Sequence, residues 1–367
     1  MTQFKFQLGT KVFFGESCVD NNKCEFAKYG KKALVVTGKH SGKASGALED
    51  VIKILNEAEI KYSIFDRIEN NPSLENVREG GDTASEYGAD FIVGIGGGSP
   101  LDASKAIAAL AVNSIEPMKL FKNEFVNKPL PIIAIPTTAG TGSEVTAASV
   151  LTVKDMQTKK SFVHEDVFPK VAFIDAKYTA SMPDEVAVNT AVDALSHAVE
   201  GYLNNTGTIM SDFYAAGAFR AFRDCMGSLV EKKFDFETRE RLLYVSMLAG
   251  MTIAQTGTTI AHGMGYSLTY FKGIPHGKAN GLLLAEYLRY NCEAGKGKVQ
   301  EFLKALNFKS IDEFGDFMGR LIKDSHKFCD EELRLYASLT MQQKSTLKNV
   351  KAVNEEDLFE ILRRSLN

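Results

Sequence analysis

The sequence lacks several features that mark particular classes of protein. It has no Cys-x-x-Cys pair, and its five cysteines are scattered and odd in number, so we expect reduced thiols without a framework role. It has no run of about 18 apolar residues, and its start alternates polar and apolar side chains. We therefore expect a cytoplasmic protein that has no membrane partner.

Positive charge is also not in excess. The 43 Lys and Arg residues are balanced by 46 Asp and Glu residues, and no basic block of five or more occurs. Without such a pool of positive charge, nucleic acid is not expected as a partner. The composition is that of a globular protein, and 367 residues allow two or three domains.

Proline is almost absent from the second half of the chain. Eight of the nine prolines lie at or before Pro183, and only Pro275 follows. Before Pro183, β-branched runs alternate with helical stretches, which predicts a parallel, doubly wound α/β sheet. Strands are expected at 33–37, 62–66, 90–95, 131–135, 150–153 and 171–175, and helices at 48–58 and 75–87.

From Asp184 onward the apolar period lengthens to that of helices. Helices are expected at 239–254, 311–324 and 358–366, the last capped by Asn354, three residues before Asp357. We therefore predict a Rossmann-like α/β domain over residues 1–183 and an all-α domain over residues 184–367. A packed junction between them could form an active-site cleft.

A run of three glycines, Gly96, Gly97 and Gly98, follows a predicted strand and precedes a helix that starts near Ser99. Ligands of doubly wound sheets bind beyond the carboxyl ends of strands, and glycine lets backbone N–H groups approach a pyrophosphate at the helix N-terminus. Asp102, in the first helical turn, would repel a phosphate, so we expect it to contact a ribose or the backbone. A tight strand-to-helix turn is the alternative interpretation.

A second polar loop follows the next strand, over residues 136–144. Four hydroxyl groups in seven residues exceed what one turn needs, and they suit a ligand that is rich in oxygen acceptors. Two such loops at successive strand ends favour a nucleotide site. The hydroxyl groups belong to Thr137, Thr138, Thr141 and Ser143.

A stripe of polar residues follows one predicted helix around residues 191–203. Asp193, Ser196, His197 and Glu200 are spaced i, i+3, i+4 and i+7 on an otherwise apolar helix. The alternative is a surface helix in which the stripe is the solvent-exposed face. The stripe contains no Lys or Arg, however, which favours burial. An Asp and a His one turn apart can bind one metal ion from the same side.

Two of the six histidines, His262 and His276, frame a glycine-rich stretch, and Pro275 and Gly277 place the second on a rigid turn. Together with Asp193 and His197 they form a set of one carboxylate and three imidazoles. Such a set suits Fe²⁺ or Zn²⁺. Either histidine taken alone is also typical of a core or surface position.

These motifs resemble those of the iron-containing (group III) alcohol dehydrogenases, a family within the dehydroquinate synthase-like fold. The resemblance covers essentially the whole chain. It is carried by Lys11-Val-Phe-Phe-Gly15, Asn70-Asn-Pro72, the loops 96–102 and 136–144, Asp193-Ala-Leu-Ser-His-Ala-Val-Glu200 and Pro275-His-Gly277.

The resemblance implies a nicotinamide cofactor in the first domain, a divalent metal in the second, and a small-molecule alcohol or aldehyde as substrate. The metal would polarise the carbonyl oxygen as a Lewis acid while the nicotinamide passes a hydride to the carbon. The implied metal ligands are Asp193, His197, His262 and His276, and the implied cofactor contacts include Asn71 and Lys160. A solvated surface lysine is the alternative for Lys160.

The chain departs from the family at Tyr266, where many members have a histidine that is proposed to pass protons. A phenol is a poor base at neutral pH, although it can donate a hydrogen bond, so we expect Tyr266 to face the metal site or the nicotinamide and orient the substrate. A tyrosine packed in the interdomain core is the alternative. A glycerol dehydrogenase and a dehydroquinate synthase are rivals within the fold, and His197 argues against both. A catalytically silent nucleotide- or metal-binding protein is the alternative from another class.

The segment after the first strand predicts NADP(H), with NAD(H) as the alternative. NAD-preferring enzymes usually place a carboxylate against the adenosine ribose, and the family places it at the position of Gly38. Here residues 35–43 contain no acid, while Lys39, Ser41 and Lys43 offer positive charge and hydrogen-bond donors.

The N-terminus predicts a homodimer. Phe4, Phe6 and Leu8 alternate with Lys5 and Gln7, which is typical of an edge strand that needs a partner. The resemblance implies the same, since relatives are often dimers joined through this region.

Overall fold

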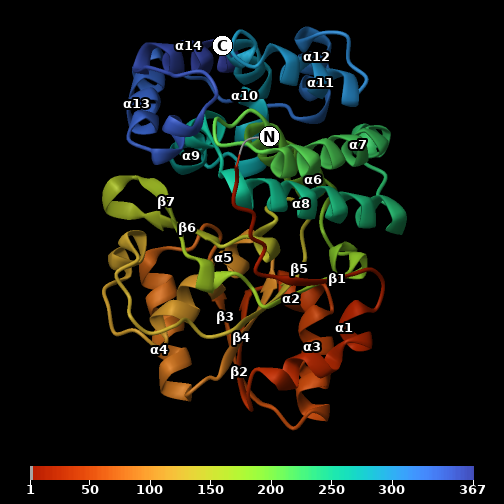
Figure 1. Cartoon of the computed structure of the whole chain (residues 1–367), viewed down its shortest axis with the longest axis vertical. Coiled ribbons are helices and arrows are strands. Elements are labelled where there is room, and N and C mark those ends of the chain that lie inside the picture. The colour runs from red at the N-terminus through yellow and green to blue at the C-terminus, as the bar shows by residue number, and fades with distance from the viewer. Residues whose placement is uncertain (1–2) are drawn as a thin grey trace. The chain divides into compact units, whose positions relative to one another are not determined.

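The computed structural model describes residues 3–367, and its chain forms two compact units (Figure 1). One unit is Leu8–Met182, and the other is Pro183–Asn367 together with the segment that precedes Leu8. We describe each unit by itself.

The first unit is built on a six-stranded parallel sheet in the order β1-β8-β5-β4-β2-β3. This arrangement confirms the doubly wound α/β architecture predicted from the sequence. A separate antiparallel hairpin is formed by β6 and β7. The strands are β1 Lys11–Phe14, β2 Lys32–Gly38, β3 Lys61–Ile68, β4 Phe91–Gly96, β5 Ile132–Pro136, β6 Ala148–Val153, β7 Thr158–Val163 and β8 Val171–Ile174.

Helices cover both faces of this sheet because alternate strand residues point to opposite sides. In β2, for example, Ala33 and Val35 join the hydrophobic core under α1 and α3, whereas Leu34 and Val36 join the core under α4 and α5. The helices of this unit are α1 Cys18–Asn21, α2 Ser41–Ala44, α3 Ala47–Glu57, α4 Leu74–Tyr87 and α5 Gly98–Leu110.

The second unit is helical, as predicted, and side-chain caps start some of its helices, among them α7, α8, α12 and α14. The side chain of Asn354 accepts a hydrogen bond from the backbone N–H of Asp357, which confirms the predicted cap. The helices are α6 Asp184–Tyr202, α7 Ile209–Glu231, α8 Phe236–Thr256, α9 Ile260–Lys272, α10 His276–Asn291, α11 Lys296–Ala305, α12 Ile311–Leu321, α13 Asp330–Met341 and α14 Glu355–Leu366.

Two sequence predictions about elements are wrong. The helix predicted to reach Asp324 ends at Leu321, and the Asp324 carboxylate instead pairs with Lys278 and His326. The edge strand predicted over residues 4–8 is not formed, because this segment pairs with no strand among residues 3–367. The backbone of Gln7 instead exchanges two hydrogen bonds with the side chain of Gln255.

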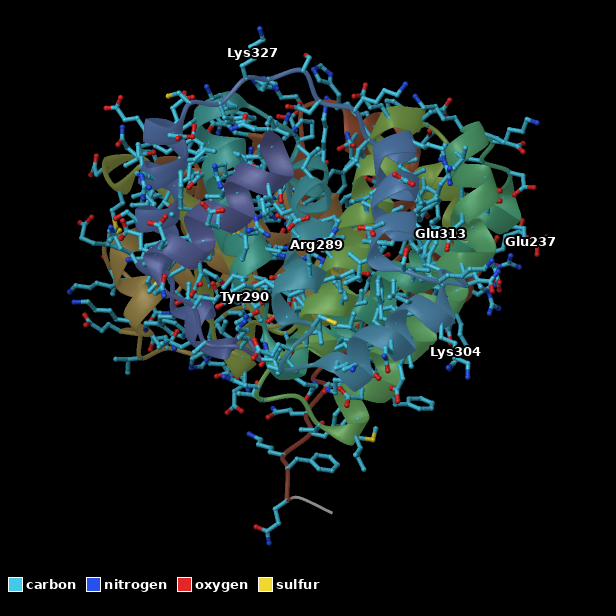
Figure 2. All side chains as sticks on the ribbon, turned by 90° about the horizontal axis from the view of Figure 1, so that it is seen from above. Glu237, Arg289, Tyr290, Lys304, Glu313 and Lys327 are labelled. Carbon is cyan, nitrogen blue, oxygen red and sulfur yellow. The ribbon has the colours of Figure 1, made fainter. Side chains whose placement is uncertain are left out.

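Many charged side chains lie on the surface of the helical unit. In Figure 2, Glu237, Lys304 and Lys327 point outward from its rim. Among the described residues, no helix is long and apolar enough to cross a membrane.

Candidate active site

The polar stripe on α6 is buried. Asp193, Ser196, His197 and Glu200 are each less than a tenth exposed. Because nearly all of the helix from Ala187 onward is also buried, these side chains meet neighbouring helices instead of solvent. The interpretation of the stripe as the solvent-exposed face of a surface helix is therefore wrong.

Tight packing at the start of α10 brings His276 to the stripe. His276 is the first residue of α10, and a Cβ atom on Gly277 would lie 1.9 Å from the carbonyl oxygen of Asn189 and 2.9 Å from Cβ of Asp193. Only glycine permits so close an approach of the two helices. Gly277 thus acts through helix packing as well as through the turn that the sequence indicated.

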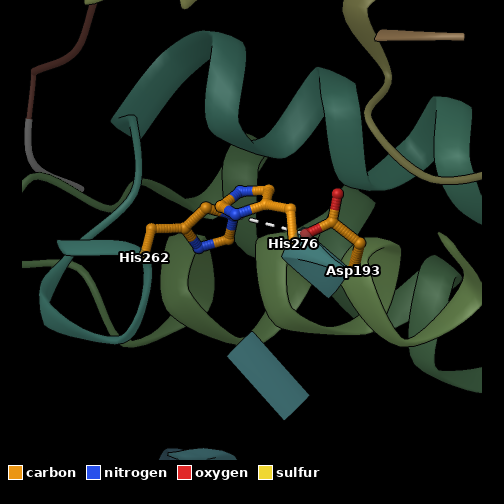
Figure 3. A group of neighbouring side chains, drawn as sticks. All are labelled: Asp193, His262 and His276. Carbon is orange, nitrogen blue, oxygen red and sulfur yellow. Dashed lines mark ion pairs between the residues drawn. The ribbon is translucent and has the colours of Figure 1, made fainter. Parts of the chain in front are cut away.

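Asp193, His262 and His276 form one group in which a ligand atom from each lies within 4.8 Å of the others (Figure 3). His262 comes from the first turn of α9, and its Nε2 lies 3.6 Å from Oδ1 of Asp193. Three helices therefore each contribute one candidate metal ligand. His197, the fourth residue implied by the family resemblance, is not in this group, although its ring centroid lies 4.4 Å from that of His262.

Asn280 shows that these ligand atoms converge on one position. Its Nδ2 donates to Oδ1 of Asp193 at 2.9 Å and lies 3.1 Å from Nε2 of His262 and 3.3 Å from Nε2 of His276. An amide NH₂ carries partial positive charge, so it contacts the three atoms as a cation would. One carboxylate and two imidazoles therefore fit Fe²⁺ or Zn²⁺.

Nothing in the sequence alone singled out Asn280. It is fully buried and is accommodated only because Gly265 has no side chain, since a Cβ there would lie 2.0 Å from Oδ1 of Asn280. The position four residues after His276, on the same face of α10, is the signal that could have identified it.

Two buried carboxylates give this site a negative character. Burial alone would raise the pKa of Asp193, but the surrounding imidazoles, first of all His197, outweigh burial and hold that pKa below its usual value. Burial also opposes protonation of His262, yet Glu200 and then Asp193 raise its pKa to about 9. The site therefore favours a positive charge at its centre.

The glycine run and the hydroxyl-rich loop lie at the ends of neighbouring strands of the first unit. Gly96 at the end of β4 is paired with Pro136 at the end of β5, and the backbone N–H of Thr137 donates to the carbonyl of Gly96. The sequence placed both loops correctly at successive strand ends.

The two loops pack directly on each other. A Cβ atom on Gly97 would lie 3.0 Å from Oγ1 of Thr138, and one on Gly98 would lie 2.6 Å from Cγ2 of Thr141. The glycines thus allow the two loops to pack this closely. Oγ1 of Thr137 is buried and has no hydrogen-bond partner in the part of the chain that the structure describes.

Asp102 and Ser143 face each other, and Lys105 joins them. The hydroxyl of Ser143 donates to Oδ1 of Asp102 at 2.5 Å, and the backbone N–H of Val150 donates to Oδ2. Lys105, fully buried, donates to Ser143 at 2.7 Å, to Thr146 at 3.1 Å and to the carbonyl of Ala148 at 2.6 Å. The backbone contact expected for Asp102 is present, and the sequence analysis missed Lys105. A single lysine followed by the small and apolar residues 106–110 was the signal.

Asn71 and Ser99 also meet beside the glycine run, where the backbone N–H of Asn71 donates to Oγ of Ser99 at 3.1 Å. Lys159 donates to Oδ1 of Asn71 at 2.7 Å and is 5% exposed. Lys160, the next residue on β7, instead lies over the ring of Phe121. Lys159 is therefore the lysine that contacts Asn71, which meets Ser99 beside the glycine run.

The predicted cofactor-selecting segment follows β2, the strand next to β4. Lys39 and Ser41 are exposed, and the atom nearest to a Cβ built on Gly38 lies 3.6 Å away. Lys43 forms an ion pair of 3.1 Å with Asp66, so its charge is shared with an acid that the sequence argument did not consider.

Known proteins are similar to this chain in sequence and in fold. The profile described as iron-containing alcohol dehydrogenase matches residues 9–176, and that of the C-terminal part of the Fe-containing alcohol dehydrogenase family matches residues 187–366. Lactaldehyde reductase of Escherichia coli is 34% identical over 307 residues, which are 82% of this chain and 79% of that protein. An NADPH-dependent butanol dehydrogenase of Clostridium saccharobutylicum is 29% identical over 88% of this chain and 84% of its own.

Among solved structures, an iron-containing alcohol dehydrogenase of Thermotoga maritima has a TM-score of 0.93 and 39% identity, and the match covers 99% of both chains. The two family profiles together span most of the sequence, and the candidate metal ligands and the parallel sheet with its two loops are both present. The chain belongs to the iron-containing alcohol dehydrogenase family and is an NAD(P)-dependent oxidoreductase of alcohols and aldehydes.

Proposed function

We propose that this enzyme interconverts a primary alcohol and its aldehyde, with a divalent cation bound by Asp193, His262 and His276 and with His197 beside them. The observation that carries this proposal is the convergence of three ligand atoms from three helices on one position within 4.8 Å of one another. When bound, the cation supplies Lewis-acid polarisation of a substrate oxygen and the nicotinamide supplies or accepts the hydride.

The protein's own residues do the binding and the orientation. The backbone of Gly96–Gly98 and the hydroxyls of Thr137, Thr138 and Thr141 line the ends of two adjacent strands, where they suit a dinucleotide. Asp102 and Ser143 hold these loops together through the hydrogen bond between their side chains. We propose Lys159 in place of Lys160 as the positive group beside the cofactor, because it reaches Asn71 next to Ser99.

We propose NADP(H) as the preferred cofactor. Gly38 leaves room beside the adenosine ribose, and exposed Lys39 and Ser41 offer positive charge and a donor for a 2′-phosphate. Lys43 contributes less than the sequence indicated because Asp66 pairs with it.

We also propose a homodimer. Residues 3–10 are neither helix nor strand, and Phe4 and Phe6 are 41% and 37% exposed. Phe6 stacks on Tyr214, next to Phe213, which is 66% exposed, so an apolar surface lies along the first turns of α7. A second copy of the chain would cover it. Light scattering that shows a monomer at all concentrations would contradict this proposal.

A cytoplasmic location fits the same proposal, because the five cysteines are free thiols. Such thiols persist in a reducing compartment.

The deciding experiment is an anaerobic assay of nicotinamide absorbance over a panel of aldehydes, with NADPH and NADH in parallel and with the bound metal measured. We expect metal-dependent oxidation of NADPH with a simple aldehyde. Activity confined to glycerol and related polyols would favour a glycerol dehydrogenase. Tight binding of nucleotide and metal without turnover would overturn the proposed reaction.

A further inference from the structure

Glu200 is a fully buried carboxylate whose two oxygens contact different groups. Its Oε2 pairs with Nδ1 of His262 in a short contact. Its Oε1 accepts four hydrogen bonds at the start of α9, from the backbone N–H groups of Thr259, Ala261 and His262 at 2.9, 3.0 and 3.2 Å and from the hydroxyl of Thr259 at 2.8 Å.

Oε1 caps the N-terminus of α9 by accepting hydrogen bonds from its first backbone N–H groups. The first N–H groups of a helix have no partner within the helix, and the helix dipole favours a negative charge there. His262 lies in this first turn, so the same contacts fix the backbone that carries a candidate metal ligand.

Oε2 determines which nitrogen of His262 carries a proton. An ionised carboxylate can only accept hydrogen bonds, so Nδ1 must donate. A cation that binds His262 displaces any proton on Nε2, and because Nδ1 still donates to Glu200 the lone pair then lies on Nε2. Nε2 is the nitrogen that faces Asp193 at 3.6 Å and the amide of Asn280 at 3.1 Å. A metal ion requires that lone pair.

We infer that Glu200 is a positioning residue of the metal site, in which Oε2 holds His262 in the Nδ1–H tautomer with Nε2 directed at the cation, and Oε1 fixes the end of α9. The inference rests on the proposed metal site. It assigns to Glu200 a function that the sequence pattern could not separate from its neighbours on the stripe.

The test is Glu200→Gln, which has nearly the same shape. The Gln carbonyl can still accept from the start of α9, but its NH₂ group then faces Nδ1 of His262. That contact requires Nδ1 without a proton, and the proton moves to Nε2, which cannot then bind metal. We expect Zn²⁺ affinity, measured by competition with a chromogenic chelator at neutral pH, to fall by about 10–100-fold. The unfolding midpoint of the metal-free protein should change much less.

Thr259→Val is the matched control. It removes one donor to Oε1 and leaves the contact between Oε2 and His262 in place. We expect a lower unfolding midpoint, with Zn²⁺ affinity within about twofold of the wild type. A twofold change in affinity corresponds to less than about 0.5 kcal/mol of binding free energy, whereas a tenfold change corresponds to about 1.4 kcal/mol.

A second measurement uses the wild-type chain and does not depend on how the variant folds. In the Zn²⁺-loaded protein with ¹⁵N-labelled histidine, nitrogen NMR should show a protonated Nδ1 and a metal-bound Nε2 for His262. A proton on Nε2, or Zn²⁺ affinity unchanged in Glu200→Gln, would overturn the inference. Failure of the wild-type protein to bind Zn²⁺ or Fe²⁺ would instead overturn the proposed metal site itself.

Discussion

The phenol ring of Tyr266 lies stacked on the imidazole of His276, with ring centroids 5.5 Å apart and planes inclined at 18°. Tyr266 thus lies beside a candidate metal ligand, as the sequence analysis expected. The stacked ring restricts the plane of the imidazole, and the hydroxyl group is a separate feature that can contact substrate.

Two variants separate these roles. Tyr266→Phe keeps the ring, so we expect unchanged metal content and a fall in kcat/KM of about fivefold, from the loss of one neutral hydrogen bond worth ~1 kcal/mol. Tyr266→Leu also removes the stack and should weaken metal binding. If Tyr266→Phe has the turnover and pH–rate profile of the wild type, the tyrosine only packs against His276.

Removal of a metal ligand should abolish activity. His276→Ala deletes one imidazole of the group in Figure 3, and Asp193→Asn removes its only carboxylate, so both variants should lose bound metal. A cation at 1,000 times its Kd stabilises the native state by about 4 kcal/mol, and chelation should therefore lower the unfolding midpoint of the wild type but not of these variants. His164→Ala, in the other unit, is the control. A fully active, metal-loaded His276→Ala would disprove the assignment.

Local and periodic features made the fold predictable from sequence. The strand at Phe91–Gly96 is a short apolar run that ends in glycine, and the cap at Asn354 involves residues three apart. The N-terminal segment alternates polar and apolar residues as a strand does, but a strand also needs a partner strand. No local pattern shows that the backbone of Gln7 forms its hydrogen bonds with the side chain of Gln255.

Three of the four ligands predicted from the sequence, Asp193, His262 and His276, lie together in the candidate site, but the residues that support them were not predictable. Asp193 and His197 share a helix face, so spacing alone links them. Asn280 and Lys105 act through contacts with distant segments, and their burial depends on the tertiary fold. Sequence spacing also could not decide between Lys159 and Lys160, because adjacent strand residues point to opposite faces.

Gly38→Asp should reverse the cofactor preference. A Cβ at Gly38 has no neighbour closer than 3.6 Å, so the aspartate fits, and its carboxylate would accept from a ribose 2′-OH and repel a 2′-phosphate. We expect the wild type to have a lower KM for NADPH than for NADH and the variant to have the opposite order. One charge-assisted contact of about 1.5–3 kcal/mol exceeds tenfold discrimination. Equal or better use of NADH by the wild type would show that Gly38 is only a turn residue.

Lys105→Met should weaken cofactor binding through the loops. The variant loses three hydrogen bonds from Nζ, so the segment 143–148 keeps the hydrogen bond from Ser143 to Asp102 but loses its other contacts with α5 through Lys105, and Asp102 loses a cation at 3.6 Å. We expect stability to fall by about 3 kcal/mol and the cofactor KM to rise, with metal content unchanged. Lys298→Met, which breaks the partly buried pair with Asp212 in the other unit, is the control. It should lower stability without changing the cofactor KM.

Glu144 should make stability depend on pH. Burial raises the pKa of this carboxyl from 4.5 to about 7, against the smaller opposing effects of its own backbone and of Lys105 on α5, and Oε1 has no hydrogen-bond partner in the described part of the chain. Below the unfolded-state pKa the group is protonated in both states and has no effect. As the pH rises from about 4.5 to 7 the unfolded chain releases its proton first, so native stability declines, by about 3 kcal/mol in total at higher pH. Glu144→Gln cannot ionise and should escape this decline. The free energy of unfolding of both proteins can be measured with urea between pH 4 and pH 8. We expect the variant to gain stability relative to the wild type from about pH 4.5 to pH 7 and the difference to be constant above that range. If the two free energies change with pH in parallel, ionisation of Glu144 does not destabilise the native state.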